Sequence, residues 1–147
     1  TDAEVTETIE IVDLLGSGSE PLRIIGNGSA LPSVPENTFT INADYEQVLS
    51  SGANLSWNVN GSFRGETQAD FDPITIASFD MDSFWMWNAA VTLDTNDSWS
   101  TRLFVRNMFD EEGITGGLPP GFASDKSSGF YVARPRTMGI GFKYTFK

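Results

Sequence analysis

The chain has 147 residues, a formal net charge of −11, no cysteine and no histidine. Without cysteine it forms no disulfide, and without histidine a Ser-His-Asp triad, a Cys-His dyad and a histidine-bearing zinc site are all excluded. The acidic balance argues against binding to nucleic acid, because phosphate recognition requires a basic surface. We therefore expect no enzyme activity and no cofactor.

The sequence shows neither an apolar segment of the length of a transmembrane helix nor the pattern of a signal peptide at residues 1–4. No segment approaches the roughly 18 consecutive apolar residues of a transmembrane helix. Residues 1–4 lack the basic and apolar regions of a signal peptide. We expect the chain to be either a mature protein or a piece of a longer one.

Five segments alternate apolar and polar residues with a period of two, which indicates strands with two different faces. In the second segment Leu55, Trp57 and Val59 share one face, while Asn58 and Asn60 point to the other. No helical pattern interrupts them. The sequence therefore predicts an all-β, antiparallel up-and-down meander. Its predicted strands are 38–46, 54–64, 84–94, 98–107 and 136–147, and residues 16–35 and 110–133, rich in Gly, Pro and Ser, are predicted loops.

Aromatic residues stand near the ends of the apolar faces. In the first strand Phe39 and Tyr45 flank Ile41 and Ala43. With the strands laid alternately up and down, the rings form two belts with small or aliphatic residues between them, the pattern of a β-barrel in a membrane. The predicted girdle residues, in contact with outer-membrane lipid, are Phe39, Tyr45, Trp57, Phe63, Trp85, Trp87, Trp99, Phe142 and Tyr144.

Short and long connections alternate along the predicted strands. Residues 47–53 and 95–97 are short links, whereas the segments before residue 38, between 64 and 84, and between 107 and 136 are long. All long links then leave the sheet at one end, as the extracellular loops of outer-membrane barrels do. This favours an outer-membrane barrel over an antiparallel sandwich, which alternation alone leaves open.

The two faces of the predicted strands differ in charge. The apolar face of the first four strands carries no charged residue, and a charge near the middle of a lipid-facing surface would cost about 2–4 kcal/mol. Arg64, Arg102 and Arg106 fall on the other face and are candidates for lining an aqueous lumen and contacting an anionic ligand. The alternative is that they pair along the sheet with Asp44, Glu46 and Asp94.

Three parts of the sequence resemble a known family. Residues 102–117 read RLFVRNMFDEEGITGG and resemble the penultimate strand and following loop of TonB-dependent receptors, whose pattern is close to Val-x-Asn-Leu-Phe-Asp. Residues 134–146, RPRTMGIGFKYTF, resemble the closing strand of that family, and residues 1–4 with 31–38 resemble an earlier loop of its barrel. The positions that match the first pattern are Val105, Asn107, Met108, Phe109 and Asp110, with Gly113 in place of a usual aromatic.

The resemblance implies that this chain is the C-terminal fragment of a barrel of about twenty-two strands, supplying the last five strands and the tail of a sixth, without the plug domain and most strands. It implies uptake of a siderophore with its iron, of cobalamin or of a carbohydrate across a Gram-negative outer membrane, energised by TonB through the missing N-terminal part. Independently of the resemblance, Gly139 and Gly141 lie on the polar face of the last strand and are expected to let another backbone or the plug approach closely, the alternative being barrel curvature. The barrel-assembly machinery would read Phe142, Tyr144 and Phe146, which Lys147 follows.

The long loops carry two further sets of candidates. Aromatic rings in a loop can stack on a sugar or a catechol, or they can pack the loops together. Acidic side chains can bind Ca²⁺, although no complete calcium-loop spacing is present and a solvated acidic surface is the simpler interpretation. The aromatic candidates are Phe71, Phe79, Phe122, Phe130 and Tyr131, and the acidic ones are Asp70, Asp72, Asp80, Asp82, Asp110, Glu111 and Glu112.

Two other functions remain open on the sequence alone. A passive porin-type barrel would allow diffusion without a plug or TonB. A soluble β-sandwich that binds a ligand would fold in water with its tryptophans in a dry core.

Overall fold

The computed structural model describes residues 3–11, 23–69, 79–95, 98–118 and 129–146. Within these residues all regular structure is β-sheet, and there is no helix long and apolar enough to cross a membrane. The chain divides into two compact units. The long-strand unit comprises residues 38–64, 84–113 and 133–147, and the hairpin unit comprises residues 1–37, 65–83 and 114–132.

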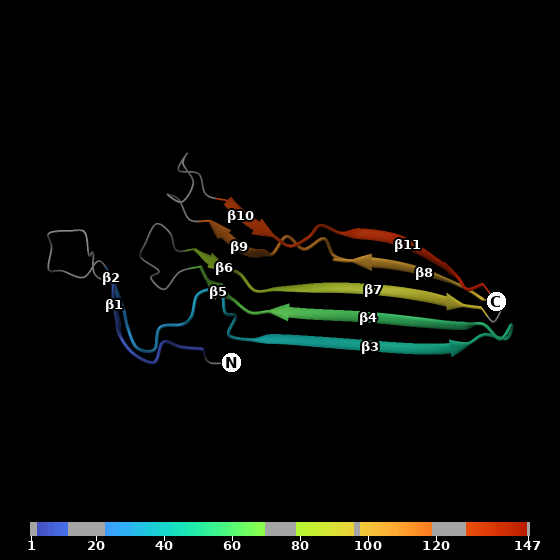
Figure 1. Ribbon diagram of the computed structural model, residues 1–147, viewed down its shortest axis with the longest axis horizontal. Helices are drawn as coiled ribbons and strands as arrows, with labels where there is room; N and C mark the ends of the chain where they lie inside the picture. The colour runs from blue at the N-terminus through green and yellow to red at the C-terminus, as the bar shows by residue number, and fades with distance from the viewer. Residues whose placement is uncertain (1–2, 12–22, 70–78, 96–97, 119–128, 147) are drawn as a thin grey trace. The chain divides into compact units, whose positions relative to one another are not determined.

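The long-strand unit is one antiparallel sheet of five strands in the order β11-β8-β7-β4-β3 (Figure 1). Each long strand pairs with the long strand that follows it in the chain, so the sheet is an up-and-down meander, as predicted. The strands are β3 (Thr38–Val48), β4 (Asn54–Arg64), β7 (Phe84–Asp94), β8 (Trp99–Arg106) and β11 (Thr137–Tyr144).

The strand pairing keeps each face of this sheet uniform. The β3–β4 ladder runs without interruption from Thr38 opposite Arg64 to Val48 opposite Asn54. The β4–β7 ladder continues from Asn54 opposite Asp94 to Arg64 opposite Phe84. Because a slip of one residue would send every side chain to the other face, these registers keep apolar residues opposite apolar residues across the sheet.

Tight local hydrogen bonding closes the short connections at one end of the sheet. Between β3 and β4 the Leu49 N–H donates to Ala53 O over 2.8 Å, and Gly52 adopts a φ of 82°, which glycine reaches at little cost. Between β7 and β8 the amide and hydroxyl of Thr95 both donate to Trp99 O, at 3.0 and 2.9 Å. The long connections all join strand ends at the opposite end of the sheet, so the predicted alternation of short and long links is confirmed.

The hairpin unit contains three short antiparallel hairpins, β1–β2, β5–β6 and β9–β10. The prediction of loops throughout 16–35 and 110–133 is therefore wrong where β2, β9 and β10 lie. These strands are too short to show a clear period of two, and the paired glycines of β9 oppose a strand assignment. Their bounds are β1 (Ile9–Ile11), β2 (Arg23–Ile25), β5 (Thr67–Gln68), β6 (Asp80–Met81), β9 (Ile114–Leu118) and β10 (Gly129–Val132).

Packing between the hairpins explains why a glycine, Gly117, lies in strand β9. The ring of Phe79 lies over Gly117, where an added Cβ would fall 2.5 Å from Phe79 Cζ. Phe79 also meets Phe130 edge to face with the ring centroids 5.0 Å apart. Met81 on β6 is 1% exposed. Tertiary contact thus offsets the low intrinsic strand propensity of Gly117.

A similar ring-on-glycine contact lies within the long-strand unit. Gly61 on β4 stands directly opposite Trp87 on β7, and the indole covers the glycine. On the other face Phe104 covers Gly139, so the idea that Gly139 leaves a gap for another backbone is wrong. The nearest heavy atom to an added Cβ on Gly141 is Arg102 O, at 3.9 Å.

We predict that Gly61→Ala destabilises the intact protein by about 1–3 kcal/mol, the range typical of overpacking, because the new methyl would fall 2.6 Å from Trp87 Cζ3. Gly141→Ala is the matched control and should change stability by less than about 1 kcal/mol, since its methyl has room. Denaturant unfolding of both variants in lipid vesicles measures the difference. Equal stability of the two variants would contradict the packing of Trp87 on Gly61.

Candidate functional site

The apolar face of the long-strand sheet is strongly exposed. Ile140 is 71% exposed, and Leu103, beside it on β8, is 56% exposed. Such a surface is unfavourable in water and marks contact with an apolar environment or a partner. Two rows cross all five strands on this face: Ala43, Val59, Ala89, Val105 and Met138, and Tyr45, Trp57, Val91, Leu103 and Ile140.

The exposure pattern along β4 is the reverse of that in a soluble sheet. The apolar residues Trp57 and Val59 are exposed, whereas Asn58 and Asn60 are half-buried. A water-soluble protein places its apolar side chains inside and its polar ones outside. Along β4, therefore, the polar side chains are the more sheltered ones.

Aromatic rings gather toward both ends of the apolar face. At the end with the long connections, Phe39 packs on Phe63 and Phe63 on Trp85, with centroids 5.8 and 5.2 Å apart. At the end with the short turns, Trp99 stacks on Phe142 at 6.1 Å. The structure thus brings the predicted girdle residues Phe39, Phe63 and Trp85 into contact at one end of the sheet. It brings Trp99 and Phe142 into contact at the other end. Tyr45 and Trp57 form a further directly opposed pair on β3 and β4.

The rings of the short-turn end do not lie in one row but step along the sheet. Leu103 on β8 lies in the row of Trp57, and the aromatic Trp99 lies four residues earlier in that strand, next to the short turn. On β11, Ile140 lies in that same row, opposite Leu103. Phe142 and Tyr144 lie two and four residues further along β11. Strands about 4.8 Å apart and tilted by about 40° require a shift of about 4 Å, or just over one residue, per strand to stay at one depth. Trp99 and Phe142 are displaced from the row of Trp57 in this way, whereas Phe39, Phe63 and Trp85 at the other end share a single row.

A row of amides crosses the polar face. Asn60 Nδ2 donates to Asn42 Oδ1 over 2.6 Å, Asn88 Nδ2 donates to Asn60 Oδ1 over 3.3 Å, and the Asn107 N–H donates to Asn88 Oδ1 over 3.1 Å. In the next row Asn58 Nδ2 donates to Asp44 Oδ1 over 2.6 Å. The sequence showed that Asn42, Asn60 and Asn88 share a face, but only the register shows that they share a row.

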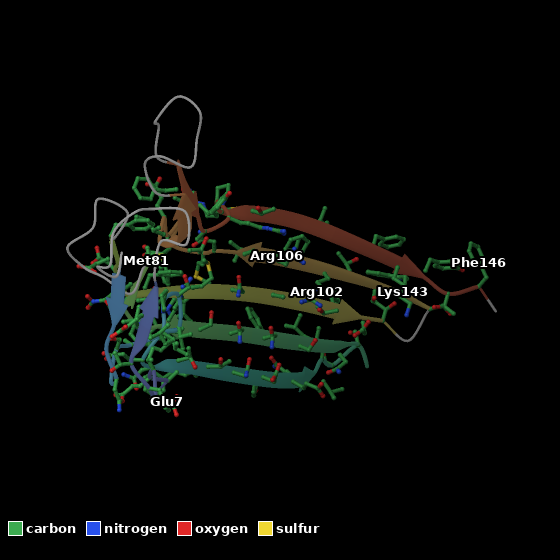
Figure 2. All side chains as sticks on the ribbon, turned by 60° about the vertical axis from the view of Figure 1, so that its left-hand side comes forward. Glu7, Met81, Arg102, Arg106, Lys143 and Phe146 are labelled. Carbon is green, nitrogen blue, oxygen red and sulfur yellow. The ribbon has the colours of Figure 1, made fainter. Side chains whose placement is uncertain are left out.

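The two arginines of β8 border a hollow of about 530 Å³ on the polar face, together with Asn58, Asn60, Asn88 and Gly141. Figure 2 shows Arg102 and Arg106 along β8 and Lys143 toward the other end of the neighbouring β11. The guanidinium of Arg106 lies over the ring of Phe104, 5.4 Å from its centroid.

The alternative of pairing along the sheet does not hold for the β8 arginines. Within the described residues neither Arg102 nor Arg106 forms an ion pair with Asp44, Glu46 or Asp94. The register explains why Arg102 does not reach Glu46, because Ser56 and Thr92 lie between these two residues in their common row. Arg64 lies at the other end of the sheet, opposite Thr38 and Phe84.

The loop candidates fall into two groups. Phe71, Phe122, Asp70 and Asp72 lie outside the described residues. Phe79 packs against Phe130, which supports a packing role for this pair, yet Phe130 and Tyr131 remain 53% and 60% exposed. No group of three or more acidic residues in the described ranges is arranged to hold a metal ion; the described acidic candidates are Asp80, Asp82, Asp110, Glu111 and Glu112.

The C-terminal aromatics lie at the short-turn end of the sheet. Tyr144 and Phe146 meet edge to face with centroids 4.8 Å apart, and Phe146 is 86% exposed (Figure 2). Phe142 and Tyr144 share the apolar face with Ile140.

A comparison with protein families matches residues 16–108 to the family described as TonB dependent receptor-like, beta-barrel. This match covers more than half of the 147 residues. The chain belongs to this family of TonB-dependent receptor β-barrels. No curated protein and no solved structure matches it. Membership implies an outer-membrane barrel engaged in transport, with contacts to lipid, to TonB and to a ligand in general, and the family consists of transporters rather than enzymes.

We predict that Val59→Arg and Asn58→Arg, adjacent on β4 but on opposite faces, differ sharply in effect. Val59→Arg should destabilise the barrel by about 2–4 kcal/mol, the cost of an arginine near the middle of a lipid-facing surface. Asn58→Arg should change it by less than about 1 kcal/mol, since the new charge faces Asp44. Unfolding of both variants in phospholipid vesicles checks this, and a larger loss for Asn58→Arg would reverse the assignment of the faces.

Proposed function

We propose that this chain supplies the closing strands and several extracellular loops of a receptor that imports a small-molecule nutrient across the outer membrane of a Gram-negative cell, driven by TonB. The plug domain and the remaining strands would belong to the same polypeptide, upstream of residue 1. The observation that carries this proposal is a sheet with a continuous, exposed apolar face that has aromatic rings toward both of its ends.

The open edges of the sheet support the placement within a larger barrel. Among the described residues β3 and β11 each pair with one neighbour only, and both edges carry unpaired backbone groups. In lipid each unpaired group would cost several kcal/mol, so a spanning sheet must close on further strands. Barrels of about twenty-two strands enclose a plugged lumen, which is wide enough for the polar face of this sheet to form part of an inner wall.

The inner wall would be suited to an anionic or hydroxyl-rich occupant. Arg102 and the asparagines of β4 and β7 place cationic and amide donors around one hollow. Arg106 and Arg64 extend the positive charge along the same face. Acidic groups of the plug, or an anionic nutrient passing it, would find donors here. The C-terminal residues Phe142, Tyr144 and Phe146 would serve as the signal for the barrel-assembly machinery.

The nutrient would be a siderophore carrying iron, cobalamin or a carbohydrate, captured partly by exposed rings of the hairpin unit. Phe130 and Tyr131 are adjacent on β10 and both are exposed. The hydroxyl of Thr115 donates to Tyr131 O over 3.1 Å, which holds the backbone of β10 beside β9. Rings on a fixed backbone lose little conformational freedom when a flat ligand stacks on them.

We predict that cells depend on both this receptor and TonB for uptake of its nutrient. Deleting the gene, inactivating TonB and collapsing the proton gradient should each reduce uptake of the radiolabelled nutrient to background. The cognate nutrient is found by growth of the deletion strain on panels of iron chelates, cobalamin and oligosaccharides. Uptake that persists without TonB would instead identify a passive barrel.

A further prediction concerns the exposed rings. Tyr131→Ala should weaken nutrient binding to intact cells by about two- to tenfold, because a lost aromatic stacking contact corresponds to about 0.5–1.5 kcal/mol. Val132→Ala, next to it on β10 and also exposed, should leave the affinity unchanged. Equilibrium binding measures both, and equal losses would show that the ring itself makes no contact with the nutrient.

A further inference from the structure

The pairing of β8 with β11 poses a register problem that the strand pairs joined by short turns do not share. β3 and β4, and β7 and β8, are joined by short turns, and a short turn fixes the register of the strands it joins. β8 and β11 are joined by the long segment from Asn107 to Arg136. A slip of two residues between them would leave every side chain on its proper face, because the side-chain period is two.

One such slip is also sterically permitted. Gly139 lies opposite Phe104 and is covered by its ring. A shift by two residues would place Gly141 under the same ring, and a glycine would again provide the space. The opposite shift would place Thr137 there, whose Cβ would collide with the ring. The apolar pattern and the packing of Phe104 therefore leave two registers that differ by two residues.

Asn107, directly after β8, binds the segment that leads into β11. Its side chain is 2% exposed, and its Nδ2 donates to Arg134 O over 2.8 Å and to Glu111 O over 2.9 Å. Its Oδ1 accepts from the Glu111 N–H over 2.8 Å. Asn107 has a φ of 49°, a left-handed conformation that asparagine tolerates better than most residues.

Asp110 adds a second contact to the same segment. Its Oδ1 accepts from the Arg136 N–H over 2.7 Å, one residue before β11 begins. Its own N–H donates to Asn107 O over 3.0 Å, so the two residues form one turn. Asp110 is also left-handed, with a φ of 58°. The contacts to Arg134 and Arg136 involve backbone atoms, so they specify a position along the chain rather than a side chain.

We propose that Asn107 and Asp110 form a register clamp that selects the pairing of β11 on β8. The clamp holds Arg134 and Arg136 at the end of β8, so that Thr137 meets Arg106 and the slipped pairing is excluded. The choice matters beyond this pair, because a closed barrel requires one total stagger of its strands. A slip by two residues at β11 would change that stagger and prevent the last strand from meeting its partner. Asn107 and Asp110 are therefore positioning residues for closure, which is independent of the nutrient transported.

These 147 residues contain no cysteine, so disulfide formation between introduced cysteines gives a direct test in the intact protein in native membranes, once any cysteine elsewhere in the polypeptide has been replaced by serine. The pair Leu103→Cys with Ile140→Cys reports the observed register, since these residues are opposite each other. Leu103→Cys with Phe142→Cys reports the permitted slip, and Leu103→Cys with Met138→Cys reports the obstructed one. All protein in the membrane fraction is scored, whether or not its barrel has closed, so a variant whose slipped strand leaves the barrel open still gives a reading.

With the clamp intact, we expect only the first pair to cross-link. Asn107→Gly keeps the left-handed backbone but removes three hydrogen bonds, and it should raise cross-linking of the Phe142 pair by about tenfold or more, the factor that 1.4 kcal/mol produces. The pair Leu103→Cys with Met138→Cys should still form no cross-link. Asp110→Gly should give a smaller effect in the same direction, and Asp110→Asn, which keeps an acceptor for Arg136, should behave as the unmodified clamp.

Asn60→Ala is the matched control, because it removes two side-chain hydrogen bonds to other asparagines of the sheet but touches neither β8 nor β11. It should lower stability without producing the slipped cross-link. The proposal is overturned if Asn107→Gly and Asp110→Gly both form only the cross-link between positions 103 and 140. It is also overturned if Asn60→Ala forms the cross-link between positions 103 and 142 to the same extent as Asn107→Gly.

Discussion

The structure depends on one property of the β-strand, namely that successive side chains point to opposite faces while the backbone groups pair only with neighbouring strands. A sheet built this way can separate two solvents if one face is apolar, the other is polar and the ladder is closed. The long-strand unit meets the first two conditions in a single layer. Its apolar rows run across all five strands, and the amide row from Asn42 to Asn107 runs across the other face.

The same property explains where the sequence was informative. Strands 54–64 and 84–94 could be bounded from alternation alone and have those bounds in the structure, because two-sided strands show their period directly. The β9–β10 hairpin could not be predicted, since Gly116 and Gly117 give no period and the strand exists through the packing of Phe79. Periodicity assigns a residue to a face, but a strand or contact that depends on a distant ring leaves no local signal.

The candidate site shows a second limit of sequence reasoning. The sequence could place Arg102 and Glu46 on one face, yet only the register shows that they share a row with Ser56 and Thr92 between them. The amide row and the clamp of Asn107 and Asp110 could not be predicted from the sequence either, because both depend on which residues become opposite one another. The family resemblance pointed to residues 105–110 and 134–136 as motifs, and the structure adds that the two motifs are hydrogen-bonded to each other.

The central claim is that the apolar face of this sheet meets lipid and the polar face meets water. The most direct test is a spin-label scan of β4 from residue 54 to 64 in the intact protein in lipid vesicles, one cysteine at a time. Collisions with oxygen should peak at Leu55, Trp57, Val59 and Phe63, and collisions with a water-soluble nickel complex should peak at the even-numbered residues, in opposite phase. If the odd-numbered positions are shielded from both probes, the apolar face is a dry protein core, and the assignment of a lipid-facing barrel wall is contradicted.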